Sequence, residues 1–504
     1  MGCAGSKAET ESNVVSAPSA IEKGMPPLPQ TQEVSSALEV DDVKPELPAV
    51  APDAPEVALA KLQTISSSYY YSVDGLLASV ESGAIAALKG RWLCELHEEG
   101  GQLQQRQDMP AEAFWTPAEL RTVATALGEN YGVLFVALST KWLSSEHPDP
   151  DGFHLDIVAE VAKLYLGMAG EQQESPLVRA FSDLGIDPDF ALFWSYPSLP
   201  QPPLSADESA LCKTGVDASK VWFGHSKSVC WMQSELPAGF GGGAYDRSGW
   251  CIVEAAISAL LKPGHHPRRL DLARRTEEAM AWCYGSDEWA AEACLDGVCT
   301  GQRLPLPKPE RLQSELETEK VFAEQADLTV ASELYRSYFA AVAGKLDHMD
   351  QSRLGWGEAE VELLSQVLPQ FSQLKSIDLS SNTLGAAGII QILQANGTPG
   401  GSLAECNVRN NNLDDESATM LAKVGTERRI MLFGLKHGQT AASFQGERLG
   451  PLDAILLASD LGVSDSLTKL DLSLNMLCGV DEEGEGEHTT DGLVAISETL
   501  KVTV

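Results

Sequence analysis

The chain has 504 residues, a formal net charge of −36 and an apolar fraction of 43%, which is ordinary for a globular protein of two to four domains. This charge argues against non-specific binding to nucleic acids and against electrostatic adhesion to anionic membranes. No apolar run reaches the roughly 20 residues that a membrane-spanning helix needs, and no signal-peptide pattern is present. The ten cysteines form no CxxC pair, which favours a reducing, cytosolic setting.

The amino terminus carries a lipidation pattern. In "MGCAGSK", Gly2 stands at the acceptor position for myristate and Ser6 at the preferred hydroxyl position, while Cys3 is a candidate for palmitoylation. One myristoyl chain binds membranes only marginally, whereas two acyl chains hold a protein stably. We therefore expect a cytoplasmic protein held peripherally on a membrane through Gly2 and Cys3, with chance occurrence of the short pattern as the alternative.

Two segments precede the first predicted strand. Residues 1–58 are rich in Pro, Ala, Ser and Glu and lack periodicity, which predicts a disordered tether. Residues 59–128 show helical patterns. In that segment Thr116 can cap a helix that has Pro117 at its first position and Glu119 at its third.

From residue 129 onward, predicted strands alternate with predicted helices. Continuous apolar runs predict buried strands, and amphipathic patterns predict helices. The strands are expected at 131–139, 189–196 and 227–232, and the helices at 152–167 and 250–261. Such strands are typical of a parallel sheet covered on both faces, and the alternation implies right-handed crossovers. We expect a doubly wound α/β domain over residues 129–310.

The helix at 250–261 contains a glutamate within its apolar stripe. Trp250, Val253 and Ile257 share one side of this helix, and Glu254 falls among them. An unpaired buried charge is costly, so the Glu254 carboxylate needs a partner or a pocket. Two interpretations stay open, a structural pairing with Arg247 and a chemical role.

This segment contains four motifs in order, "VLFVALSTKW", "LFWSYPSLPQ", "VWFGHSKSVCWM" and "RSGWCIVEA". In this order they resemble the motifs of the TIR superfamily, and more closely those of its HET (heterokaryon-incompatibility) branch. The last one resembles the HET motif RxWTxQE and the TIR motif SxWCxxEL, with Trp250, Cys251 and Glu254 in register. The segment departs from the HET pattern at Ser195, where that pattern has Asp. The resemblance implies a TIR/flavodoxin-like fold and self-association of the domain.

The resemblance also implies an activity. In enzymatic TIR domains the residue that matches Glu254 hydrolyses NAD, so Glu254 is the candidate catalytic residue and NAD the possible substrate. Ligands of doubly wound sheets bind beyond the carboxyl ends of the strands, where Ser139 and Lys141 are expected. Lys141 and Arg247 could neutralise a pyrophosphate, and Trp194 or Trp250 could stack on a ring.

Alternatives to catalysis remain at this stage. Many TIR and HET domains only bind each other, and the segment could also be an unrelated doubly wound domain with another strand order. The His and Cys residues show no recognised metal-ligand spacing, so no metal site and no required cofactor are predicted.

Residues 366–504 repeat a leucine-rich pattern after a predicted helical connector at 311–365. Copies of the frame L-x-x-L-x-L-x-x-N-x-L begin at Leu374, Leu403 and Leu467, and a degenerate copy begins at Phe444. Leu374 and Leu403 are 29 residues apart, which fits the long, helix-backed class of ribonuclease-inhibitor type. We expect a leucine-rich repeat solenoid.

Exposed strand positions of such repeats form an extended binding face. Here they are Lys375, Ser376, Asp378, Ser380, Glu405, Asn407, Arg409, Lys469 and Asp471. A protein ligand is favoured over nucleic acid because the chain is acidic. The sequence thus predicts a membrane-tethered intracellular signalling or recognition protein, with the TIR/HET-like domain as output and NAD cleavage as its candidate activity. The alternative is a non-catalytic interaction scaffold at a membrane.

Overall fold

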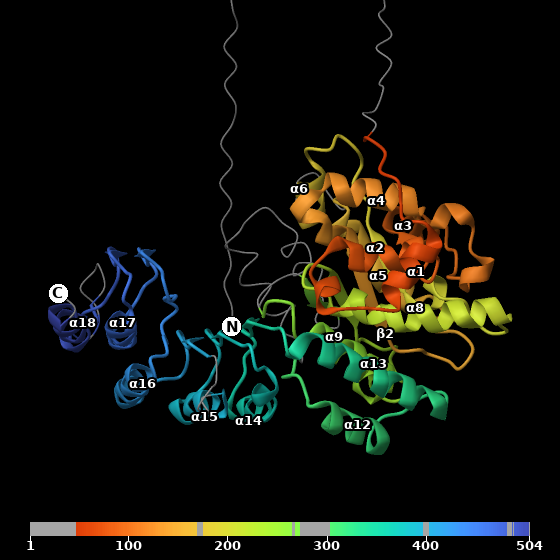
Figure 1. The fold of residues 1–504 in the computed structure, drawn as a ribbon. Coiled ribbons are helices and arrows are strands. Elements are labelled where there is room, and N and C mark those ends of the chain that lie inside the picture. The colour runs from red at the N-terminus through yellow and green to blue at the C-terminus, as the bar shows by residue number, and fades with distance from the viewer. Residues whose placement is uncertain are drawn as a thin grey trace, which may run out of the picture. The chain divides into compact units, whose positions relative to one another are not determined.

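The computed structural model describes residues 47–168, 175–264, 268–272, 303–396, 403–480, 486 and 488–502 (Figure 1). Gly2, Cys3 and most of the predicted tether at 1–58 lie outside the described residues. Residues 47–54 contain no helix or strand, and the first helix begins at Pro55. None of the helices in the described part of the chain is long and apolar enough to cross a membrane.

Short helices and one very short strand come first. They are α1 (Pro55–Leu62), α2 (Val73–Glu81), β1 (Leu88–Lys89), α3 (Gly90–Glu98) and α4 (Pro117–Ala126). The predicted start of α4 is confirmed. The hydroxyl of Thr116 accepts from the Glu119 amide at 3.2 Å, and the Glu119 carboxylate accepts from the Thr116 amide at 3.0 Å. This reciprocal cap satisfies two amides that the first turn of a helix leaves unpaired.

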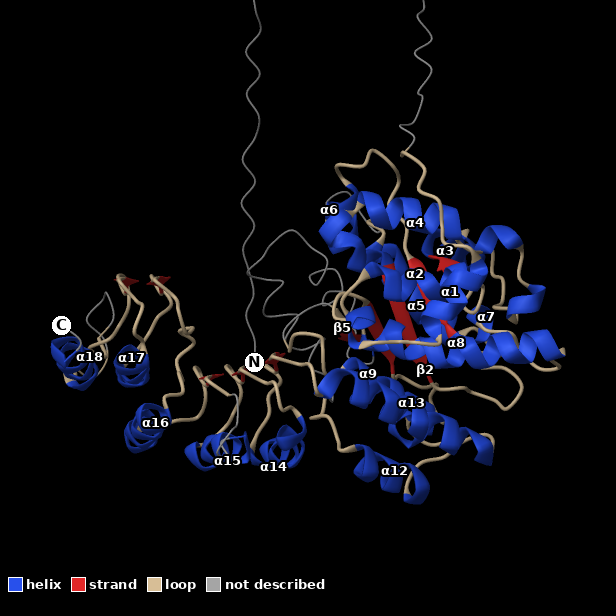
Figure 2. Cartoon of the chain, in the orientation of Figure 1, coloured by secondary structure: helices blue, strands red, loops and turns tan. Residues whose placement is uncertain are grey.

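A mixed sheet forms the centre of the first part of the chain (Figure 2). Its other strands are β2 (Phe135–Thr140), β3 (Ala191–Trp194), β4 (Val229–Gln233) and β5 (Arg269–Asp271). The strand order is β1-β3-β2-β4-β5, and all neighbours are parallel except the edge pair β1–β3. The predicted α/β class with parallel strands is therefore confirmed. Strand β2 begins four residues later than predicted, because Gly128–Leu134 forms a 3₁₀ helix.

Helices cover both faces of this sheet. They are α5 (Phe153–Tyr165), α6 (Pro176–Phe181), α7 (Ser195–Ser198), α8 (Ala206–Gly224) and α9 (Gly249–Ser258). The connection from β2 to β3 carries α5, and the connections from β3 to β4 and from β4 to β5, which run the other way along the sheet, carry α8 and α9. Right-handed crossovers therefore place α5 on one face and α8 and α9 on the other. Aromatic contacts agree with this arrangement. Tyr165 of α5 packs against Trp231, whereas Trp222 of α8 packs against Phe135 and Phe193.

Two further helices, α12 (Pro309–Thr318) and α13 (Gln325–Ala343), lead to the carboxy-terminal part, and α13 packs on α9. The end of α9 is held by Arg303, whose guanidinium donates to the carbonyls of Ala259 at 2.5 Å and Pro263 at 2.7 Å. The backbone carbonyl of Arg303 accepts from the Trp356 indole at 2.8 Å. Buried Trp356 thereby ties the carboxy-terminal part to α9.

Strands and helices alternate regularly in the carboxy-terminal part. The strands are β6 (His348–Asp350), β7 (Ser376–Asp378), β8 (Glu405–Asn407), β9 (Ala441–Ser443) and β10 (Lys469–Asp471). The helices are α14 (Glu358–Val367), α15 (Ala386–Asn396), α16 (Asp415–Arg428), α17 (Pro451–Val463) and α18 (Asp491–Val502). In Figure 2 the strands lie along one side and the helices along the other. Strand β6 lies within the segment predicted as a helical connector, so the regular alternation begins earlier than the sequence pattern indicated.

Asparagines join three of these units to the loop of the preceding unit. The Oδ1 atom of Asn382 accepts from the amides of Leu354 and Trp356, each at 3.0 Å. Asn411 and Asn475 accept in the same way from one earlier amide each, at 3.0 Å. The residue before each asparagine has a positive φ, and Arg353 and Arg448 share this conformation without a following asparagine. The same backbone conformation therefore identifies two further units, in which Leu354 and Leu449 stand where the other units have asparagine.

Candidate functional site

A cluster of polar groups lies at the carboxyl ends of β2 and β4, where the order of the parallel strands reverses. The Ser139 hydroxyl, on β2, donates to Oε2 of Glu254 at 2.5 Å. The Tyr245 hydroxyl lies 2.5 Å from Ser139 Oγ and 3.6 Å from the sulfur of Met232, on β4. Since Ser139 donates to Glu254, Tyr245 donates to Ser139, and the three groups form one hydrogen-bonded chain.

Strand periodicity explains why Ser139 faces Glu254. Side chains two apart on a strand share a face, so Ser139 projects to the same side as Phe135. Phe135 packs against Trp222 of α8 at 5.5 Å between ring centroids, on the face that α9 also covers. Helix α9 begins in close contact with the Phe322 ring. A Cβ atom added at Gly249, its first residue, would lie 2.1 Å from that ring. Glu254 then falls in the second turn of α9.

Burial keeps this cluster uncharged at neutral pH. Burial of the carboxyl raises the pKa of Glu254 to about 8, and the hydrogen bond from Ser139 opposes this only in part. Burial also raises the pKa of Tyr245 well above its usual value and that of Cys251 to about 12. Burial therefore favours the neutral, protonated form of Glu254 at pH 7 in this structure.

A glycine-rich loop at 236–247 covers the cluster and carries Tyr245. The ammonium group of Lys141, two residues beyond Ser139, donates to the carbonyls of Gly242 at 2.8 Å and Ala244 at 2.9 Å. Burial lowers the pKa of Lys141. Gly243 has a φ of +80°, which a side chain would disfavour. Lys141 thus holds the loop that places Tyr245 on Ser139.

Trp194 is not part of this cluster. Its neighbour Phe193 packs against Trp222, on the face that Ser139 also uses. Alternation along β3 therefore turns Trp194 to the opposite face of the sheet, where it is fully buried. The prediction that Trp194 stacks on a ligand ring beside Glu254 is wrong, because the sheet separates the two side chains.

Trp250 and Arg247 also point away from Glu254. The Trp250 indole donates to the Asp327 carboxylate at 3.0 Å and packs against Phe322. The Arg247 guanidinium donates to the carbonyl of Glu319 at 3.2 Å. Arg247 therefore does not pair with Glu254, and stacking of Trp250 on a ligand ring stays a prediction. Both side chains instead join α9 and its preceding loop to the α12–α13 region.

Sequence reasoning missed Tyr245 and an aromatic group at the same edge of the sheet. Tyr245 lies in an irregular loop, where spacing gives no signal for its contact with Ser139. Trp142, which follows β2, contacts Tyr196, which follows β3, at 5.7 Å between ring centroids, and His147 contacts Tyr196 at 4.7 Å. Trp142 is 37% exposed, so this group offers the accessible ring surface that Trp194 does not.

The predicted binding positions of the repeats lie on the strands or just beside them. The strand centres Ile377 and Cys406 are buried, while their neighbours Asp378, Glu405 and Asn407 are partly exposed. Lys375 and Lys469 are exposed, and Asp471 is partly exposed. Several of these groups bond to one another or to the backbone. The Asn407 amide donates to Asp378 at 2.9 Å, and Glu405 accepts from the His437 amide at 2.9 Å.

The strand face is interrupted between β8 and β9. Within the described residues, β6, β7 and β8 form one parallel sheet and β9 and β10 form another. After β8, Met431 and Leu432 still pair with this sheet, because the amides of Cys406 and Val408 donate to their carbonyls at 2.7 and 2.9 Å. The amides of Leu432 and Phe433 then donate to buried Asp460 of α17, at 2.5 and 2.9 Å, instead of to a next strand. The predicted positions therefore divide between two sheets.

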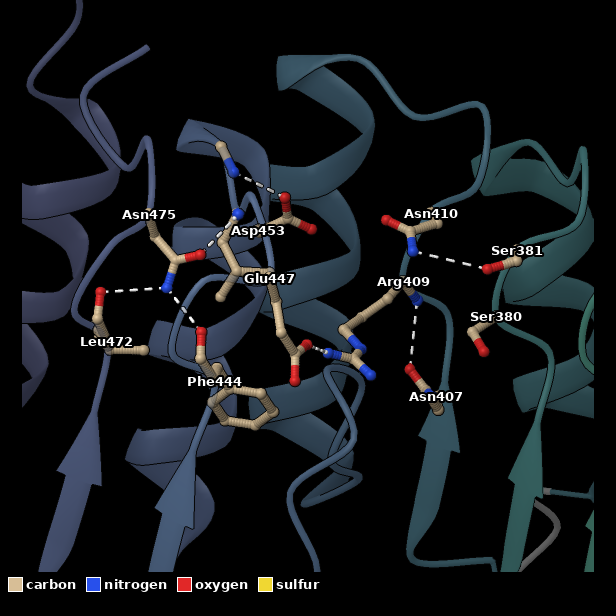
Figure 3. A network of polar contacts seen from close by, with 12 residues as sticks. Ser380, Ser381, Asn407, Arg409, Asn410, Phe444, Glu447, Asp453, Leu472 and Asn475 are labelled. Atoms are coloured by element: carbon tan, nitrogen blue, oxygen red, sulfur yellow. Dashed lines mark hydrogen bonds and ion pairs between the residues drawn. The ribbon is translucent and has the colours of Figure 1, made fainter. Parts of the chain in front are cut away.

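Arg409 bridges this interruption (Figure 3). Its guanidinium carbon lies 5.2 Å from the centroid of the Phe433 ring and 5.5 Å from that of Phe444, and the two rings contact each other at 5.2 Å. It also forms an ion pair with Glu447 at 2.5 Å. Arg409 was predicted as a ligand-binding residue, but these contacts give it a structural role between the sheets.

Among the described residues, no group of His, Cys, Asp and Glu is arranged to hold a metal ion. Comparison with models of protein families and with curated proteins finds no match to the chain.

Proposed function

We propose that this chain is a membrane-tethered signalling or recognition protein whose α/β domain cleaves NAD in the manner of TIR domains. The strand order β3-β2-β4-β5 corresponds to the flavodoxin-like order 2-1-3-4, the order expected of a TIR/HET-like domain. The observation that carries the proposal is the meeting of Ser139 and Glu254 where that order reverses. Ligands of open α/β sheets bind at this point.

The proposed reaction breaks the bond between nicotinamide and the ribose. Nicotinamide leaves with the bonding electron pair, water adds to the ribose carbon, and a proton is released. An ionised carboxylate beside the ribose stabilises the positive charge that develops on the sugar, as in glycoside hydrolysis. Glu254 would supply this carboxylate, and the exposed ring of Trp142 could stack on a base of the dinucleotide.

The closed loop sets a condition for this activity. Glu254 is neutral while Tyr245 and the loop at 236–247 enclose it, since burial raises its pKa to about 8. Opening of the loop would expose the carboxyl to water, lower its pKa and admit substrate. In this proposal the closed structure is the resting form, and self-association or ligand binding at the repeats favours the open form.

The carboxy-terminal part is proposed to be a leucine-rich repeat solenoid that binds a protein partner. Support comes from the alternation of parallel strands and helices and from the asparagines that fasten successive units. Because the strand face divides after β8, the partner would contact β6–β8 and β9–β10 as two patches, with Asp378 and Asn407 on the first and Lys469 and Asp471 on the second.

The closed loop at 236–247 also supports a second proposal, in which the chain is a non-catalytic scaffold. Tyr245 occupies the hydrogen-bonding position next to Ser139 that a substrate hydroxyl would use. If the loop never opens, Glu254 is a structural acid, and both parts of the chain serve only to bind proteins. Acyl groups on Gly2 and Cys3 would then recruit those partners to a membrane.

NAD turnover by the full chain, immobilised on vesicles or beads to force association, distinguishes the two functions. We expect slow release of nicotinamide by the wild type and none by Glu254→Gln, while Glu362→Gln, at an exposed position on α14, keeps full activity. Absence of turnover in the wild type under forced association would contradict the enzymatic proposal and leave the scaffold.

A further inference from the structure

A cavity of about 130 Å³ lies on the far side of α9 from Glu254, where α9, the segment at 304–308, α12 and α14 meet. Its apolar wall includes Ile252, Ala255, Ala256, Leu312 and Leu363. At 100° per residue, Ile252 and Ala256 point about 160° away from Glu254 around the helix. The cavity is therefore separate from the candidate active site, and the inference below does not depend on the proposed NAD cleavage.

The charged groups of this cavity are mainly basic. Lys308 and Arg311 line it, together with Arg269, whose guanidinium donates to the Ser258 hydroxyl at 3.0 Å, and Glu315 is the single acidic residue among the lining side chains. The Glu315 carboxylate is already paired, at 2.8 Å, with Lys320, which is not one of those side chains. The chain as a whole carries a net charge of −36, so a cavity with an excess of cations stands out against its surface.

Exposed apolar surface marks the mouth of the cavity. Leu304 lines it and is 56% exposed, one of the few large apolar side chains of the described residues that are so accessible. Exposed apolar surface next to a cavity is typical of a binding site. A cavity of about 150 Å³ in another protein holds one benzene ring, so the present cavity has room for a ring or a short alkyl chain.

We propose that this cavity binds a small organic anion, a carboxylate carried on an aromatic ring or a short aliphatic chain. The apolar body lies against Ile252, Ala256 and Leu312, and the carboxylate meets Lys308 and Arg311 at the rim. The volume of the cavity limits the apolar part of the ligand to one ring or a short chain, and the lining cations favour a ligand with a negative charge.

Three probes with one ring and different charges test this proposal on the full chain. They are 4-fluorophenylacetate, 4-fluorobenzyl alcohol and 4-fluorobenzylamine, and their binding is followed by fluorine NMR line broadening. We expect the anion to bind about tenfold more tightly than the alcohol, and the amine to bind most weakly, since each tenfold step corresponds to the energy of one partly screened charge contact. Equal binding of anion and alcohol, or no binding of any probe, would overturn the proposal.

Two variants locate the binding. The double variant Lys308→Glu, Arg311→Glu should reverse the order, so that the amine binds better than the anion. Unfolding cannot produce such a reversal, and acidic residues in the first turn of α12 favour that helix. Ala256→Phe should fill the cavity and abolish binding of all three probes. Lys423→Glu, at an exposed position on α16, is the matched control and should change nothing. An unchanged order in the double variant would refute the site.

Residues 273–302 of the same chain are the alternative occupant of this cavity. After Arg275 this segment has six acidic residues, no Lys or Arg, and the aromatic residues Trp282, Tyr284 and Trp289, and it adjoins Arg303 and Leu304. If the anion binds only after Trp282→Ser and Trp289→Ser are introduced together, the segment itself fills the cavity and the proposal fails. If the affinity is the same with and without these changes, the cavity is open to a ligand.

Discussion

Replacement of Glu254 by glutamine should make the protein more stable at alkaline pH, although Glu254 is the candidate catalytic residue. In the folded chain the pKa of Glu254 is raised to about 8, whereas an unfolded glutamate titrates near 4.3. The unfolded state therefore releases a proton that the folded state keeps. The stability that this group provides is complete below about pH 4 and is lost as the pH rises to 8.

The size of the effect follows from the shift. Between the two pKa values, wild-type stability should fall by about 1.4 kcal/mol per pH unit from this group alone, or roughly 4 kcal/mol from pH 5 to pH 8. Glu254→Gln keeps an oxygen that accepts from Ser139 and has no charge to bury. The variant should match the wild type at pH 5 and melt about 8 °C higher at pH 8, at roughly 2 °C per kcal/mol for a domain of this size.

Calorimetry of the wild type, Glu254→Gln and the surface control Glu362→Gln at half-unit steps from pH 5 to pH 8.5 measures this difference. The control should follow the wild type at every pH. A gap between wild type and Glu254→Gln that stays constant with pH would mean that Glu254 is ionised and stabilised in the folded chain. Burial would then not keep Glu254 neutral, and the candidate site would have no neutral resting form.

Three further changes test other contacts. Lys141→Met removes two charge-assisted hydrogen bonds to the loop at 236–247, so limited proteolysis within that loop should speed up at least tenfold, and an unchanged rate would show that Lys141 does not hold it. Asn382→Ala removes buried hydrogen bonds to two loops and should lower the free energy of unfolding by about 2–4 kcal/mol, measured by chemical denaturation. Asn475→Ala, at a partly exposed position, should lower it by less, and equal losses would contradict the role of burial. Arg409→Ala should weaken the junction between the sheets by about 1–2 kcal/mol. Hydrogen exchange should then rise in β9 and β10 but not in β6 and β7, and a uniform rise would argue against a local junction.

The elements with strong local signals could be predicted from the sequence. The buried strands, the helix at 152–167 and the cap of α4 have patterns that depend on neighbours within a few residues, and the structure contains all of them. The meeting of Ser139 and Glu254 follows from the rule for the carboxyl ends of parallel strands. Strand β6 was missed, because three residues flanked by polar side chains carry little periodicity.

The orientation of site residues was less predictable, for two physical reasons. Trp194 and Phe193 are adjacent aromatic residues on one buried strand, and an apolar run that is covered on both faces does not reveal which side each residue takes. The Trp250 indole donates to the Asp327 carboxylate and the Arg247 guanidinium to the Glu319 carbonyl, and both partners lie more than 70 residues away in sequence. Contacts over such separations leave no local pattern.

The interruption after β8 also has a consequence for how the chain could change in evolution. The residues with positive φ that mark successive units are 26 to 29 positions apart, except across this interruption, where Asn410 and Arg448 are 38 apart. An extra residue inserted within a paired strand would shift the register of that strand against its neighbours. Here the following strand forms no pair with Met431 in the described structure, so its register is set by β10 alone. A change of length between Phe433 and β9 would therefore leave the strand pairing on either side of the interruption unaltered.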